Sequence, residues 1–224
     1  PIIVSPGGSG PGLAFAGANS DVQLALAPLT VEAVSAYRAK VHESAIAHGR
    51  RPEDIKILFV FKPEIVDSQE EVDRVVEASL HPSDAAVRTI LQGQSSDLET
   101  DLTALDPDAP FDTSIFGQHV SQGTIRGLVG DSGEPQTLRQ IATRKAKKGR
   151  IADGNGFVGT VEQVADFIET LGDDAGNDGF IFSGDLHPVT IHGYLDRLVP
   201  ELRRRGVLRS EWGDHGTRSN LFGS

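Results

Sequence analysis

Short apolar runs alternate along the chain with longer segments in which apolar residues recur at helical spacing. Residues 55–61 are apolar at almost every position, which is typical of a strand buried on both faces of a parallel sheet. Thr160 and Gln163 have the spacing of a capping box, and the apolar residues after them share one helical face. The pattern predicts strands at 2–4, 21–26, 55–61, 157–160 and 179–183, and helices at 11–18, 30–48, 161–171 and 190–205. We interpret the order as a strand–helix unit repeated four times.

A long stretch, residues 65–155, interrupts this repeat. It carries a capping box at Ser68 and Glu71, and its pattern predicts further helices at 83–105 and 136–148. We therefore expect four segments. They are barrel strand–helix units at 1–64, a helical insertion at 65–155, the final barrel units at 156–206 and a C-terminal tail at 207–224.

The chain length limits the size of the barrel. Without the insertion about 133 residues remain, and at roughly 30 residues per unit they accommodate about four strand–helix pairs. A closed eight-stranded barrel needs about 250 residues before any insertion. We therefore expect an α/β fold of the TIM-barrel type, (β/α)8, of which this chain covers about the four C-terminal units. The absence of an initiator Met agrees with a missing N-terminal half.

Charge and composition exclude several functions. The net charge of −11 at pH 7 repels nucleic acid and anionic membrane surfaces over most of the molecule. No apolar run approaches the roughly 20 residues of a membrane helix, and the first residues lack the layout of a signal peptide. The chain has no Cys, which excludes disulfides, thiolate metal sites and a Cys nucleophile. We expect a cytoplasmic protein that binds neither nucleic acid nor membranes.

A glycine-rich turn follows the first apolar run and precedes the first predicted helix. Free backbone N–H groups and a hydroxyl at a helix N-terminus favour a phosphate. Gly7, Gly8, Ser9 and Gly10 are therefore the candidate phosphate-binding residues. The alternative is an ordinary strand-to-helix turn, in which the glycines serve tight geometry and Ser9 only caps the helix.

The run VSPGGSGPGLAFA resembles the V-Q-A-G-x-S-x-x-G-x-x-F-A pattern of flavin-dependent monooxygenases in the bacterial-luciferase-like superfamily. The resemblance is to the group that contains nitrilotriacetate, EDTA, pristinamycin and dibenzothiophene-sulfone monooxygenases. Further matches follow in order along the chain: RPEDIKILF, SQEEVDRV, TLRQIA, FVGTVEQVADFI, DGFIF and LDRLVPELRRRGVLR. The resemblance covers essentially all 224 residues and corresponds to the C-terminal half of such a protein.

The resemblance implies a TIM-type barrel and an oxidoreductase that oxygenates a small organic substrate with O2 and reduced FMN. A separate NAD(P)H:flavin reductase would deliver the FMN. In such proteins the turn at Gly7, Ser9 and Gly12 contacts the FMN phosphate, in agreement with the physical interpretation of the residues. Ser5 and Pro6 stand where the pattern has Gln-Ala, which removes an amide side chain, and Pro6 has no N–H to offer. We expect a homo-oligomer, and we expect this chain alone to be inactive.

Other side chains suggest no firm chemistry, so the catalytic residues stay unknown. His187 and His192 are five residues apart and do not stack on one helical face, so we expect no metal site. His119 is either an exposed loop residue or a proton-handling group near the substrate. The basic cluster at 144–150 is either the end of a helix or a docking patch for an anionic substrate or the reductase.

Two other classes of function fit the same residues. One is a different phosphate-binding barrel enzyme, such as a deazaflavin-dependent oxidoreductase, an aldolase or an isomerase. The other is a non-enzymatic half-barrel fragment with a binding or assembly role, whose open parallel edge would tend to dimerise.

Overall fold

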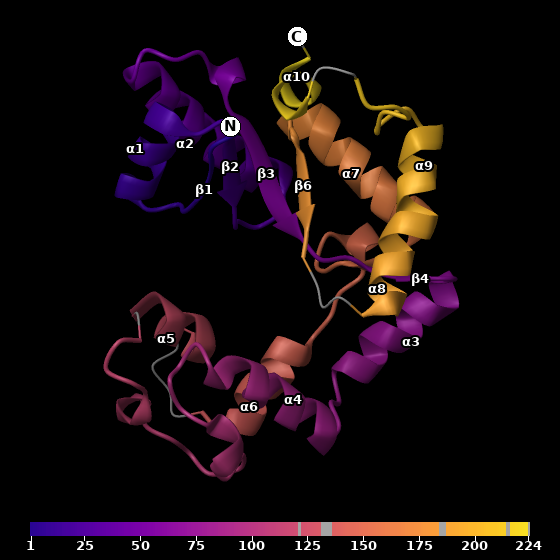
Figure 1. Ribbon diagram of the computed structural model, residues 1–224. Helices are drawn as coiled ribbons and strands as arrows, with labels where there is room; N and C mark the ends of the chain where they lie inside the picture. Colours follow the sequence, from indigo (N-terminus) through magenta and orange to yellow (C-terminus); the bar gives the residue numbers. More distant parts are fainter. Residues whose placement is uncertain (121, 131–135, 184–186, 214–215, 224) are drawn as a thin grey trace. The chain divides into compact units, whose positions relative to one another are not determined.

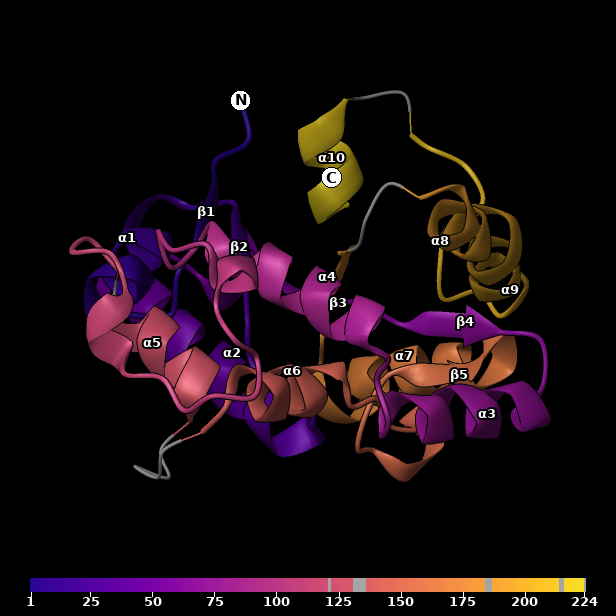
Figure 2. The ribbon, with the colours of Figure 1, turned by 90° about the horizontal axis from the view of Figure 1, so that it is seen from below.

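The computed structural model describes residues 1–120, 122–130, 136–183, 187–213 and 216–223. The chain forms two compact units (Figure 1; the same ribbon from below in Figure 2). The first unit comprises Pro1–Gln69 and Arg150–Ser224, and the second comprises Glu70–Gly149. The four segments expected from the sequence stay a prediction. No helix in the described ranges is long and apolar enough to cross a bilayer.

A parallel sheet forms the centre of the first unit. Its strands are β1 (Val4–Pro6), β2 (Val22–Ala25), β3 (Lys56–Phe61) and β6 (Gly179–Phe182), in the order β1-β2-β3-β6. The register pairs Ser5 with Gln23 and Phe59 with Phe180. Sequential order and parallel direction are expected when each strand is followed by a helical crossover.

Helices follow the strands and cover one face of this sheet. They are α1 (Gly10–Asn19), α2 (Val31–Ala47) and α7 (Val161–Ala175). Phe59 and Phe61 of β3 are fully buried in one core with Val34 of α2 and Val164 of α7. Thr30 caps α2 by accepting a hydrogen bond from the N–H of Ala33 over 3.2 Å. The helix predicted at 30–48 is thus confirmed.

Burial alternates along β3, which corrects the expectation of a strand buried on both faces. Ile57, Phe59 and Phe61 are buried, whereas Leu58 and Val60 on the opposite face are only half-buried. The physical reason is that the core helices pack on one face only. Leu58 and Val60 therefore lie on an apolar face of the sheet that the rest of the chain covers only in part.

A second, smaller sheet pairs β4 (Glu64–Val66) with β5 (Val158–Thr160) in parallel. The sequence predicted a strand at β5 but not at β4, and β5 lies outside the main sheet. The capping box predicted at Thr160 and Gln163 is confirmed. The hydroxyl of Thr160 accepts from the N–H of Gln163 over 3.4 Å, and the Gln163 side chain accepts from the N–H of Thr160 over 3.0 Å.

The last long helix is irregular. It consists of α8 (Pro188–His192), the π-helical stretch η5 (Gly193–Leu198) and α9 (Val199–Arg204). The sequence predicted a regular helix here. Pro200, at the start of α9, has no N–H to continue the α-helical ladder, which accounts for the interruption. A short helix, α10 (Thr217–Phe222), follows in the tail.

The second unit is helical. Its helices are α3 (Gln69–Ser79), which begins at the boundary, α4 (Asp84–Ser95), α5 (Gln122–Val129) and α6 (Leu138–Ala146). Short 3-10 helices are η1 (Pro52–Asp54), η2 (Leu102–Ala104), η3 (Thr113–Ile115) and η4 (Ile151–Asp153), of which η2 and η3 lie in this unit. The helix predicted at 83–105 ends at Ser95. The Ser95 hydroxyl donates to the carbonyl of Leu91 and accepts from the N–H of Leu102, so the chain turns back here.

Candidate functional site

The candidate site is the turn between β1 and α1, at the carboxyl end of a strand in the main sheet. Gly7 has a φ of +118°, a conformation that favours glycine. Ser9 caps α1 and accepts a hydrogen bond from the N–H of Gly12 over 3.3 Å. A Cβ on Gly12 would lie 3.2 Å from the Ser9 hydroxyl oxygen and 3.3 Å from the Gly7 carbonyl oxygen. Tight turn geometry therefore explains Gly7, Ser9 and Gly12 without any ligand.

Three N–H groups of the turn, those of residues 8–10, are not used by hydrogen bonds within it. Pro11 has no N–H, Gly12 donates to the Ser9 hydroxyl, and Leu13 donates to the Ser9 carbonyl over 2.8 Å. The N–H groups of residues 8–10 meet no acceptor in the described part of the chain, and these residues are exposed. The first turn of α1 has no acidic residue. Successive free N–H groups at a helix N-terminus carry partial positive charge and can bind an anion.

A buried polar cluster lies beneath the turn. Ser5, Ser20 and Gln23 are at most 5% exposed. The Gln23 side-chain nitrogen donates to the Gly7 carbonyl over 2.7 Å, and the Tyr37 hydroxyl donates to the same carbonyl over 3.3 Å. Sequence reasoning missed this cluster. Its one signal was a Gln inside the apolar run at 21–26, a polar side chain that burial obliges to find partners.

The other candidate residues have local structural roles. His187 caps α8 by accepting from the N–H of Val189 over 3.3 Å, and His192 pairs with the carboxylate of Asp196. His119 is exposed in the second unit. Among the residues that the structure describes, no group of three His, Cys, Asp or Glu side chains could hold a metal ion.

Arg144 of the basic cluster at 144–150 contributes to the packing of the second unit. Arg144 near the end of α6 donates to the carbonyl of Leu128 and, over 2.5 Å, to the side chain of Gln136. These bonds tie the end of α5 to α6. Arg144 therefore has a structural role, and the two interpretations of the whole cluster stay predictions.

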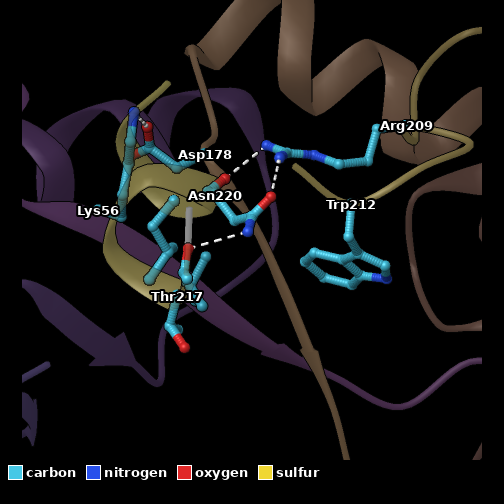
Figure 3. A pocket seen from close by; sticks show the side chains of 9 residues that line it. Lys56, Asp178, Arg209, Trp212, Thr217 and Asn220 are labelled. Atoms are coloured by element: carbon cyan, nitrogen blue, oxygen red, sulfur yellow. Dashed lines mark hydrogen bonds and ion pairs between the residues drawn. The ribbon is translucent and has the colours of Figure 1, made fainter. Parts of the chain in front are cut away.

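Figure 3 shows a pocket of about 680 Å³ that is lined by Lys56 and Asp178 among others. These two residues lie at the amino ends of β3 and β6, whereas the turn lies at the carboxyl end of β1. Arg209 and Trp212 of the tail line it together with Lys56 and Asp178. The Arg209 guanidinium points at Asn220 of α10 and donates to its carbonyl over 2.6 Å. Ligands of parallel α/β sheets bind at the carboxyl ends of the strands. This pocket lies at the other end of the strands, where the tail packs against the sheet, so we assign it to packing.

No family model matches the chain. The chain is 27% identical over 225 residues to dimethyl-sulfide monooxygenase of Hyphomicrobium sulfonivorans, an alignment that covers 100% of this chain and 45% of that protein. It is 29% identical over an alignment of 236 residues to dibenzothiophene-sulfone monooxygenase of Rhodococcus erythropolis, covering 99% of this chain and 48% of the relative.

Among solved structures, the crystal structure of DmoA from Hyphomicrobium sulfonivorans matches with a TM-score of 0.69 at 26% identity. That match covers 100% of this chain and 46% of DmoA. The chain therefore spans about half the length of the curated relatives it matches. The resemblance found in the sequence is confirmed as a similarity: the whole chain resembles curated monooxygenases and the DmoA structure over about half of their length.

Proposed function

We propose that this chain supplies the flavin-phosphate turn of a two-component, FMN-dependent monooxygenase that uses reduced FMN and O2 to oxygenate a small organic molecule. The observation that carries the proposal is the set of three exposed N–H groups at residues 8–10, which lack acceptors in the described part of the chain. Homology to monooxygenases supports the reaction class. A separate NAD(P)H:flavin reductase, a homo-oligomeric state and a cytoplasmic location belong to the same proposal.

The donor set of the turn suits a phosphate group. Residues 8–10 offer donors, and no carboxylate stands in the first turn of α1 to repel an anion. The helix N-terminus adds favourable electrostatics. Bound FMN would supply the redox chemistry, and the residues of this chain would hold its phosphate and fix its orientation.

The sheet supports the proposed architecture. Strands β1, β2, β3 and β6 are parallel, neighbour one another in chain order and carry helices on one face, as consecutive strands of a (β/α)8 barrel do. The opposite face presents apolar Leu58 and Val60 only half-buried. We assign this face to the interior of a TIM-type barrel, to which the chain contributes about the C-terminal four units.

Flavin binding tests the proposal, because FMN and riboflavin differ only in the phosphate. We expect a fluorescence titration of the purified chain to give FMN an affinity about 10- to 100-fold higher than riboflavin, since a few charge-assisted hydrogen bonds supply that difference. Equal affinities, or binding of neither flavin, would contradict the proposal.

A substitution at Gly10 separates phosphate binding from helix stability. A Cβ on Gly10 meets no atom within 4 Å, so a side chain fits there. Gly10→Asp places a carboxylate beside the free N–H groups, where it stabilises the helix but repels a phosphate. We expect this variant to keep its thermal stability and lose the preference for FMN. Gly10→Asn, of matched size and without charge, is the control and should retain most of the preference.

A further inference from the structure

We propose that Gln23 is a positioning residue for the phosphate turn, because it fixes the peptide between Gly7 and Gly8 with the Gly8 N–H facing the bound anion. The inference rests on the proposed function and deepens it. It concerns a residue of β2, which lies outside the turn and cannot be found from the turn's own sequence.

The Gln23 amide has a defined orientation. Its side chain is fully buried, and its nitrogen lies 2.7 Å from the Gly7 carbonyl oxygen and 3.4 Å from the Leu24 carbonyl oxygen. Its oxygen accepts from the Ser5 hydroxyl over 2.8 Å. The reverse orientation would place the amide oxygen against two carbonyl oxygens. It would also leave the Ser5 hydroxyl facing an NH2 group, which cannot accept its proton. Gln23 is therefore a donor toward the turn.

The hydrogen bonds of the cluster run in one direction and end at the turn. Ser5 uses its single proton toward Gln23, so Ser20 must be the donor in the 2.6 Å bond between the two hydroxyls. Gln23 also donates to the Tyr37 hydroxyl over 3.1 Å, and Tyr37 in turn donates to Gly7. No buried side-chain donor or acceptor lacks a partner among the residues described. Such a directed, fully satisfied network is rigid.

Because the Gly7 carbonyl is held by hydrogen bonds, peptide geometry also fixes the direction of the Gly8 N–H. In a trans peptide the carbonyl of one residue and the N–H of the next point in opposite directions. Two donors hold the Gly7 carbonyl toward the buried cluster, so the Gly8 N–H points to the exposed side. Without these donors the peptide is free to rotate at Gly7, and a carbonyl oxygen facing the anion would repel it.

The strand register places the Gln23 amide directly beside position 5. The flavin monooxygenase pattern that residues 4–16 resemble has Gln at the position of Ser5. Ser5 and Gln23 are direct register partners on neighbouring strands, and their side chains touch. The amide is thus present on the opposite member of the same cross-strand pair.

Flavin selectivity of four variants tests the inference. Gln23→Leu keeps the volume of the side chain and removes both donors, and we expect it to lower FMN affinity about ten-fold while riboflavin affinity stays unchanged. The swap Ser5→Gln with Gln23→Ser should recover most of the loss. Tyr37→Phe removes the second, longer bond to Gly7 and should give a smaller loss, and it keeps the inference testable if Gln23→Leu does not fold. Val41→Ala, a fully buried truncation in α2, controls for general destabilisation and should leave the FMN-to-riboflavin ratio unchanged.

The outcomes separate this inference from the function on which it rests. A wild-type chain without preference for FMN overturns the proposed function and the inference together. A wild-type preference that persists in folded Gln23→Leu, or that Val41→Ala reduces equally, overturns the inference alone. If only the Tyr37→Phe variant folds, a ratio equal to that of the wild type is the overturning result.

Discussion

A Cβ on Gly17 would lie 2.3 Å from the hydroxyl oxygen of Ser44, so α1 and α2 meet at a point where no side chain fits on α1. Ser44 also donates to the carbonyl of Leu13 over 2.9 Å. The helix that begins at the proposed phosphate turn is therefore fixed along its length against α2. This close contact requires glycine for its small size rather than for an unusual backbone conformation.

Gly17→Ala should destabilise the first unit by about 1–3 kcal/mol, because the methyl group must displace the backbone of α2 as well as the Ser44 side chain. Urea denaturation measures the change in the free energy of unfolding. Gly172→Ala in α7 is the matched control. A Cβ there meets no atom within 4 Å, and the same substitution should stabilise by about 0.5–1 kcal/mol. If Gly17→Ala leaves the free energy of unfolding unchanged, α1 and α2 do not pack as closely as this contact requires.

Arg50 should be far more important for stability than its neighbour Arg51. The Arg50 guanidinium donates to the carbonyls of Gly17, Ser20 and Asp54 over 2.8–3.1 Å and so satisfies the end of α1. Arg51→Ala removes only an exposed pair with Asp54.

We expect Arg50→Ala to lower the free energy of unfolding by about 2 kcal/mol and Arg51→Ala to leave it nearly unchanged. Equal effects of the two substitutions in thermal or urea denaturation would rule out the capping role of Arg50.

Acid should destabilise α9 through Glu201. Hydrogen bonds from Arg204 and Arg205 lower the pKa of Glu201 to about 2, from an ordinary value of 4.5. The unfolded chain therefore binds the proton first as pH falls, so the stabilisation is complete above pH 4.5 and is lost as the pH falls from there toward 2. Urea midpoints measured across this window should fall less steeply for Glu201→Gln than for the wild type. Identical slopes would contradict the assignment, and Glu211→Gln in the tail serves as the control.

Local signals predicted the elements that depend on neighbours in the sequence. The capping box at Thr160 and Gln163 and the cap of α2 at Thr30 are of this kind, and both are confirmed. Strand β4 was missed because its partner β5 lies about ninety residues further along, so three residues of weak pattern carried no signal. The predicted helix at 83–105 was too long because Ser95 bonds with Leu102 and turns the chain back.

The residues of the candidate site also fall into two groups, those that the sequence alone could identify and those that it could not. The glycines and Ser9 of the turn form one continuous motif, and the sequence was enough to single them out. Gln23 donates to the Gly7 carbonyl directly, and its other partners, Ser5 and Tyr37, lie on β1 and α2. Only the folded arrangement of these elements brings the four residues together. A lone Gln in an apolar strand indicates that a partner exists but does not say which residue it is.

The most direct test of the central claim is a ¹⁵N–¹H correlation spectrum of the whole chain, titrated separately with FMN, inorganic phosphate and riboflavin. We predict that the amide signals of Gly8, Ser9 and Gly10 shift downfield with FMN and with phosphate, because their N–H groups gain a charged acceptor, and that riboflavin leaves them in place. If FMN binds and these three signals do not move, or if no flavin binds, the turn is not a phosphate site and the proposed function is wrong.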